Sequence, residues 1–192
     1  MLGIGMVVGY FYGFGKMMME VERNMRELLV PPAAEMQVTA VARKFEWHFH
    51  YPGADGEYGR TSLREISVTN PVGLDFKDAS AQDDLITREL VLPCETEVLV
   101  ATGSVDVIHA LGNLHGDFAL DATPGVNNEA VLYTPSSPTS GTLRCVQLCG
   151  AGFKDHHAPY KFVTSEEFEK WLKEQPTAAE TAAKPAAVPP GK

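Results

Sequence analysis

Short runs of alternating hydrophobic and polar residues recur along most of the chain from Met36 onward. The run Met36–Ala42 alternates, and the next, Phe45–Tyr51, places an aromatic side chain at every second position. Alternation with a period of two is the pattern of a strand with one buried face. Similar runs, separated by turn residues, predict further strands at Glu65–Val68, Thr87–Leu92, Glu97–Thr102, Val105–Ala110, Ala130–Thr134 and Gly141–Leu148. Many short strands at such spacing predict a mainly β fold, a β-sandwich or a Greek-key barrel.

The first residues of the chain have a different pattern, apolar and without alternation. The 18 residues of Leu2–Met19 include one charged side chain, Lys16. This length is at the lower limit for a helix that crosses a bilayer, and a lysine near its end can reach the membrane surface. We therefore expect residues 1–30 to form a membrane anchor and a juxtamembrane helix. The alternatives are a signal peptide, although its positive n-region and cleavage motif are not seen, and a helix buried in a soluble domain.

Prolines mark the two ends of the predicted β domain. Pro31 and Pro32 stop the N-terminal helical pattern and begin the domain, which we expect to span residues 31–175. Near its end, Ser165–Glu174 predicts one closing helix with Ser165 as N-cap. Residues 176–192 are rich in alanine and proline and predict a disordered tail.

Composition and charge exclude several functional classes. Hydrophobic residues make up 44% of the chain, which argues against a disordered protein. The formal net charge is −9, from 16 basic and 25 acidic residues. Nucleic-acid binding needs cations to displace counterions from phosphates, so no nucleic-acid partner is expected. An acidic surface is compatible instead with docking of a basic protein.

Two of the three cysteines, Cys145 and Cys149, are four residues apart and lie in a segment that continues with glycines. A loop of this kind lets both sulfurs turn toward one point, and histidines are within reach at His109, His156 and His157. Thiolates together with imidazoles suit copper or zinc. Two buried structural cysteines are the simpler alternative for the Cys-x3-Cys spacing alone.

Several sequence blocks, in order along the chain, resemble subunit II of the haem–copper respiratory oxidases. The likeness extends over roughly Gly9–Leu172, nearly the whole chain before the predicted tail. The blocks that carry it are the aromatic segment Phe45–Gly53, Asp106–His109, Asp121–Gly125 with Asn128, the cysteine loop Cys145–Gly150, and Glu166–Phe168 with Trp171 and Leu172.

The resemblance implies a cupredoxin fold on a membrane anchor, with a binuclear copper centre called CuA. Such a subunit is non-catalytic: it takes electrons from cytochrome c and passes them to haem in subunit I, which carries out the oxygen chemistry. The inner or plasma membrane would hold it, with the cupredoxin domain on the periplasmic face. Matched position by position, Cys145 and Cys149 are the bridging thiolates, His109 is one imidazole ligand, and the carbonyl of Gln147 is the axial ligand.

The loop after the cysteines departs from the family pattern. Phe153 stands at the position of the family's second histidine ligand, and His156 stands where the family has methionine. Pro159 follows two residues later than expected, which indicates a two-residue insertion. In one interpretation, His156 or His157 supplies the second imidazole. In the other, the centre is lost and the chain is a copper-depleted structural subunit II of a quinol-oxidising oxidase or of a nitric-oxide-reducing relative. A nitrous oxide reductase-like copper domain fits the aromatic block and the anchor less well.

Other positions also differ from the family. Gln147 replaces a glutamate that reaches an interface magnesium ion, and a neutral amide is a poorer ligand for a hard cation, which weakens the case for that ion. Phe45 stands where many members have the electron-entry tryptophan, so Trp47 is a second candidate for electron entry, although aromatic residues on a strand usually pack in a core. His48 and His50 alternate with the aromatic positions and are expected to face solvent or another subunit.

Overall fold

The computed structural model describes residues 12–21, 34–112 and 118–183. The chain divides into two units, Met1–Ala33 and Ala34–Lys192. In the first unit, residues 12–21 are helical and expose Tyr12 and Met17–Met19. Most of the predicted membrane anchor lies outside the described residues, and within them no helix has the length and apolar character needed to cross a membrane.

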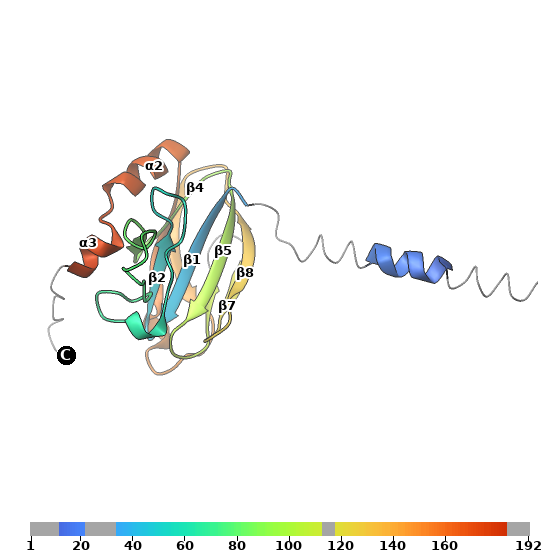
Figure 1. Ribbon diagram of the computed structural model, residues 1–192, viewed down its shortest axis with the longest axis horizontal. Coiled ribbons are helices and arrows are strands. Elements are labelled where there is room, and N and C mark those ends of the chain that lie inside the picture. The colour runs from blue at the N-terminus through green and yellow to red at the C-terminus, as the bar shows by residue number, and fades with distance from the viewer. Residues whose placement is uncertain (1–11, 22–33, 113–117, 184–192) are drawn as a thin grey trace, which may run out of the picture. The chain divides into compact units, whose positions relative to one another are not determined.

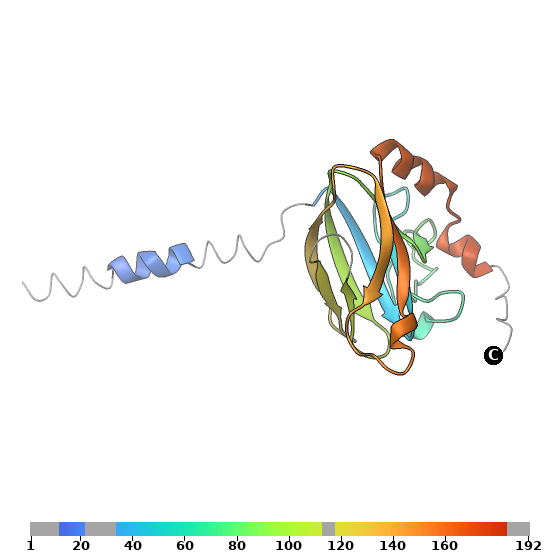
Figure 2. The ribbon, with the colours of Figure 1, turned by 180° about the vertical axis from the view of Figure 1, so that it is seen from behind.

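The second unit is built on two five-stranded sheets (Figure 1). The strand order is β3-β2-β1-β5-β8 in the first sheet and β4-β10-β9-β6-β7 in the second. In Figure 2 the view is turned by 180° about the vertical axis, so that the second sheet lies toward the viewer. The strands are β1 (Met36–Arg43), β2 (Glu46–Tyr51), β3 (Leu85–Thr87), β4 (Leu90–Pro93), β5 (Glu97–Ser104), β6 (His109–Gly112), β7 (Ala119–Ala122), β8 (Asn128–Tyr133), β9 (Thr139–Cys145) and β10 (His157–Val163).

The apolar faces of both sheets meet in one core. The first sheet contributes Val38 and Phe49, the second Leu111 and Phe162, and all four side chains are buried. Strand β1 pairs in parallel with β5 and antiparallel with β2, and β10 pairs in parallel with β4. Two sheets packed over a shared core form a sandwich. The predicted mainly β sandwich is therefore confirmed.

Strand β2 is buried on both faces, which the alternating pattern did not predict. Its aromatic residues face the core, but His48 and His50 are only 4% and 3% exposed. The expectation that these histidines face solvent or another subunit is wrong for the chain as described. His50 can be buried because it has a polar partner from outside the strand. Its Nε2 lies 2.6 Å from a carboxylate oxygen of the buried Asp84.

Several predicted strand limits differ from those observed. Thr87–Leu92 divides between β3 and β4, and β6 begins only at His109. No strand forms at Glu65–Val68, where a 3-10 turn, η1 (Leu63–Glu65), is followed by irregular chain. The side chain of Asn70 organises this region: its amide nitrogen donates to the carbonyl of Leu74, and its oxygen accepts from the Leu74 N–H. Such local side-chain bonds compete with strand pairing.

The C-terminal part of the described chain contains two helices, α2 (Ser165–Glu174) and α3 (Ala178–Ala183). The N-cap of α2 is Thr164 rather than the predicted Ser165, and it forms a capping box with Glu167. Helix α3 lies in the segment where a disordered tail was predicted, so that prediction is wrong for residues 178–183. The sequence signal was a second Thr-x-x-Glu box, in which Thr177 and Glu180 exchange hydrogen bonds.

Candidate metal centre

Four buried side chains that offer soft or borderline metal ligands meet at one end of the sandwich: His109, Cys145, Cys149 and His156. Their ligand atoms all lie within 4.8 Å of one another. His109 begins β6, Cys145 ends β9, Cys149 lies in the loop that follows, and His156 comes directly before β10. Residues separated by 47 positions in the sequence are thus brought to one point by the pairing of β6, β9 and β10.

Backbone hydrogen bonds hold both ends of the cysteine loop. The N–H of Cys145 donates to the carbonyl of His156 at 2.9 Å, and the N–H of Val146 donates to the carbonyl of Ala110, also at 2.9 Å. The first bond fixes the two ends of the loop against each other, and the second ties the loop to the strand that carries His109. The ligand positions are therefore set by sheet pairing rather than by the loop alone.

A 3-10 turn, η2 (Phe153–Asp155), forms in the segment where the two-residue insertion is predicted. The N–H of Phe153 donates to Gly150 O, and the N–H of His156 donates to Phe153 O. The turn packs Phe153 against the hydrophobic core and brings His156, not His157, to the cysteines. His157 is exposed and pairs with Arg144 in the sheet. His156, directly before the strand, is buried with the cysteines, whereas His157, the first residue of β10, lies outside the cluster.

The distances within the cluster fit a site with shared sulfurs. The two sulfurs are 3.8 Å apart. Nδ1 of His109 lies 3.8 Å from Sγ of Cys145, and Nδ1 of His156 lies 3.7 Å from Sγ of Cys149. Thiolates bind zinc at about 2.3 Å, so an ion of similar size can contact both sulfurs across this gap. The carbonyl oxygen of Gln147 lies 3.2 Å from Sγ of Cys145 and so places an oxygen atom beside the cluster.

Two members of the cluster, the Cys149 thiol and the His156 imidazole, are neutral near pH 7. Burial, together with the neighbouring Cys145, raises the pKa of the Cys149 thiol to about 11. Burial and the nearby His109 lower the pKa of His156 to about 4. A neutral imidazole is ready to bind a metal, whereas the thiol must lose its proton when the metal enters. The Nε2 atom of His156 is buried without a hydrogen-bond partner among the residues that the structure describes.

Asp106 orients His109, a role that sequence reasoning missed. Nε2 of His109 lies 2.8 Å from Oδ1 of Asp106, and the backbone N–H of Lys44 donates to Oδ2 at 2.8 Å. Partial burial opposes ionisation, but these hydrogen bonds hold the pKa of Asp106 below its ordinary value. An ionised carboxylate only accepts, so Nε2 carries the hydrogen and Nδ1 is left to face the cysteines. The Asp-x-x-His spacing was the available signal.

Two aromatic side chains cover the imidazole of His156. Trp47 stacks on it, with ring centroids 5.0 Å apart and an interplanar angle of 25°, and Phe45 meets it edge-on at 6.3 Å. Trp47 is only 1% exposed, so it lies within the core as the simpler interpretation of the aromatic run expected. Phe45 lies over the cysteine loop, and a Cβ atom on Gly152 would collide with its ring. Both electron-entry candidates are thus in contact with the ligand cluster or its loop.

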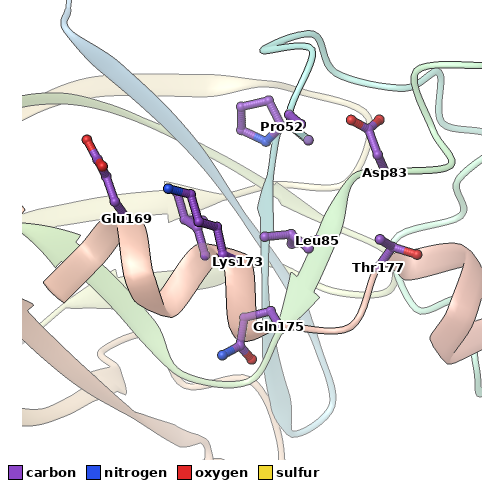
Figure 3. A pocket seen from close by; sticks show the side chains of 10 residues that line it. Pro52, Asp83, Leu85, Glu169, Lys173, Gln175 and Thr177 are labelled. Atoms are coloured by element: carbon purple, nitrogen blue, oxygen red, sulfur yellow. The ribbon is translucent and has the colours of Figure 1, made fainter. Parts of the chain in front are cut away.

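A pocket elsewhere on the domain is lined by none of these ligand residues. It has a volume of about 440 Å³ and lies where α2 and the α2–α3 connection approach the turn after β2 (Figure 3). Pro52 and Leu85 contribute apolar surface, and Asp83, Glu169 and Lys173 contribute charge. The donor chemistry of the buried cluster therefore makes the cluster, rather than this pocket, the candidate functional site.

The chain is similar to known subunits 2 of cytochrome c oxidase. No protein-family model matches the chain. It is 30% identical over 155 residues to the alternative cytochrome c oxidase subunit 2 of Bradyrhizobium diazoefficiens, a match that covers 80% of this chain and 56% of the relative. It is 26% identical over 148 residues to cytochrome c oxidase subunit 2 of Saccharomyces cerevisiae, covering 77% of this chain and 57% of that protein. The chain thus spans little more than half the length of these relatives.

A solved structure has the same fold. The periplasmic domain of subunit II of cytochrome oxidase from Bradyrhizobium japonicum superimposes with a TM-score of 0.55 at 20% identity. The match covers 75% of this chain and 95% of that domain. The predicted resemblance to subunit II and the predicted cupredoxin-like fold are both confirmed, and the buried cluster is compatible with a CuA-type copper site.

Proposed function

We propose that this chain, whose cupredoxin domain resembles that of cytochrome c oxidase subunit II, is the electron-entry subunit of a membrane-bound haem–copper terminal oxidase. The observation that carries the proposal is the buried cluster of two cysteines and two histidines at one end of the sandwich. A structural role alone does not require two thiols and two imidazoles to share one buried site. The curated relatives support the same role through their names.

The donor set fits copper better than a hard metal ion. Thiolate and imidazole ligands favour copper and zinc, whereas magnesium and calcium favour oxygen. In the proposed site the copper would be held by the sulfurs of Cys145 and Cys149, by Nδ1 of His109 and His156, and by the carbonyl oxygen of Gln147. His157 is not proposed as a ligand, because it is exposed and lies in the sheet pairing away from the cluster. A binuclear copper centre in this position would supply one-electron transfer with little rearrangement.

The protein holds the proposed ligands in place and keeps water out. All four side chains are no more than 6% exposed, and Asp106 fixes the orientation of His109. In this proposal the η2 turn presents His156 as the second imidazole ligand. Rigid ligands keep the geometry similar in both oxidation states, which favours fast electron transfer.

Electron entry in this proposal runs through the aromatic side chains next to His156. Phe45 lies over the loop and is partly exposed, while Trp47 is stacked on the imidazole inside the core. Phe45 therefore has the outer position and Trp47 the inner one. The proposed partners are cytochrome c as donor and subunit I, with its haem, as acceptor. The proposal places the domain on the periplasmic face of the inner or plasma membrane, and it includes no interface magnesium at Gln147.

Rapid mixing of the copper-loaded chain with reduced cytochrome c tests the role. We expect oxidation of the cytochrome with a matching change in the copper absorption. Cys149→Ser should abolish both changes, because it removes one of the two bridging sulfurs. Cys94→Ser is the matched control, since Cys94 lies outside the cluster, and it should leave both unchanged. A wild-type chain that retains no copper would instead favour the copper-depleted structural subunit.

A further inference from the structure

A second hollow lies where β1 ends and β2 begins, next to the metal centre. Its volume is about 410 Å³, and Val68 and Pro71 form part of its wall. Three of its lining residues are cationic, Arg43, Lys44 and Arg88, and one is a carboxylate, Glu46. The chain as a whole carries a formal charge of −9, so the sign of the charge is reversed at this place.

The single carboxylate of the hollow is already engaged. Oε2 of Glu46 accepts a hydrogen bond from a guanidinium nitrogen of Arg88 at 2.7 Å. Although burial acts in the opposite direction, the hydrogen bond and charge of Arg88 keep the pKa of Glu46 below its ordinary value. Within the described part of the chain, neither Arg43 nor Lys44 forms an ion pair. The hollow therefore has two cationic side chains that form no ion pair within the described part of the chain.

A buried histidine completes the lining. His48 is 4% exposed, and its Nε2 lies 3.3 Å from the Glu46 carboxylate without forming an aligned hydrogen bond. Burial, followed by the nearby charge of Arg88, lowers the pKa of His48 to about 4. The imidazole is therefore neutral at pH 7 and can donate one N–H. Arginine, lysine and a neutral imidazole N–H together are donors suited to the oxygens of an anion.

We infer that this hollow binds an oxyanion, a phosphate or a carboxylate group, held by Arg43 and Lys44 with support from Arg88 and His48. A guanidinium presents paired N–H groups that match phosphate and carboxylate oxygens. The inference goes beyond the electron-entry role and does not depend on metal binding. The site lies close to the metal centre, because the backbone N–H of Lys44 donates to Asp106, which holds His109.

The test uses the full chain in its metal-free form, so that its outcome is separate from that of copper binding. Sodium phosphate and sodium acetate are titrated in parallel at constant ionic strength set with sodium chloride. We expect phosphate, acetate or both to cause a saturable rise in Tm and a saturable shift of the His48 ring resonances. The more effective of the two anions identifies the group that the hollow prefers. No saturable response to either anion would overturn the inference.

Substitutions of the lining residues then test whether the anion response comes from this hollow. The double variant R43Q/K44Q should raise the anion concentration that gives half of the response by at least about tenfold, since it removes two charge-assisted donors. Lys44→Gln alone is the second variant, because Lys44 is exposed and its loss does not threaten folding. The control R60Q/K170Q removes the same two charges from other parts of the surface. An equal response in R43Q/K44Q and in the control would mean an adventitious ion only and would overturn the inference.

Discussion

Nδ1 of His156 lies 3.7 Å from Sγ of Cys149, although His156 stands where the family pattern has methionine. The η2 turn makes this contact, since it adds residues between the cysteine loop and β10 and ends directly at His156. The turn thus brings an imidazole into the cluster from the segment that follows the cysteine loop.

Substituting each of the two candidate histidines in turn shows which one binds copper. His156→Ala should lower copper affinity strongly, because it removes one of two nitrogen ligands from a buried site. His157→Ala is the matched control, since this adjacent residue is exposed and lies outside the cluster. Copper competition with a chelator, together with absorption spectra, measures both. Equal behaviour of the two variants would contradict the assignment of His156.

Asp106→Asn tests the orientation of His109. The change keeps the shape of the side chain but removes the charge that accepts from Nε2. Loss of such an outer partner typically lowers metal affinity by about 10–100-fold. Asp155→Asn, an exposed carboxylate in the η2 turn, should leave the affinity unchanged. An Asp106→Asn chain with wild-type copper affinity would show that Asp106 does not position the ligand.

The start of α2 can be tested by a pair of neighbouring substitutions. Thr164→Ala removes the side chain that accepts from the Glu167 N–H and should lower the free energy of unfolding by about 1 kcal/mol. Ser165→Ala changes a residue inside the first turn and should alter it by less than about 0.5 kcal/mol. Urea unfolding of the metal-free chain measures both. A larger loss of stability in Ser165→Ala than in Thr164→Ala would instead indicate that Ser165 is the N-cap.

The pH dependence of stability should report the burial of His48. Its pKa falls from the ordinary 6.5 to about 4 in the folded chain, through burial first and Arg88 second. The unfolded chain therefore binds the proton first as pH falls, and the free energy of unfolding decreases between about pH 6.5 and 4. The shift corresponds to a loss on the order of 3 kcal/mol across this window.

Urea unfolding of the metal-free chain at several pH values measures this loss. His48→Gln should reduce the dependence without abolishing it, because the substituted side chain does not titrate, whereas His156, whose pKa is also lowered to about 4, still does. His157→Gln, at an exposed position, should leave the slope as it is. A slope that is the same in His48→Gln as in the wild type would show that another group is responsible.

The sequence predicted β1 and β2 most closely, because the alternating runs cover nearly the whole of each strand. It missed β10, because Pro159 stands inside a strand that pairs on both sides. Proline is rare in central strands, so the pattern favours a loop there. The Thr177–Glu180 capping box did not enter the prediction, because the alanine and proline content of the segment favours a disordered tail.

The ligand set was predictable only in part. Cys145, Cys149 and His109 follow from motifs that keep their spacing. His156 and His157 are adjacent, and the sequence does not say which face each one takes. That choice depends on where η2 ends and on the β9–β10 register, both of which are tertiary properties. The role of Asp106 also required the distance to His109, because a carboxylate near a histidine is common on protein surfaces.

Copper content and electron paramagnetic resonance of the full chain, loaded with copper under reducing conditions and then partly oxidised, test the central claim most directly. The account predicts two copper ions per chain and the hyperfine pattern of one unpaired electron shared between two copper nuclei, as two bridging thiolates and two imidazoles require. A chain that binds no copper, or one copper ion with the signal of an isolated centre, would contradict it.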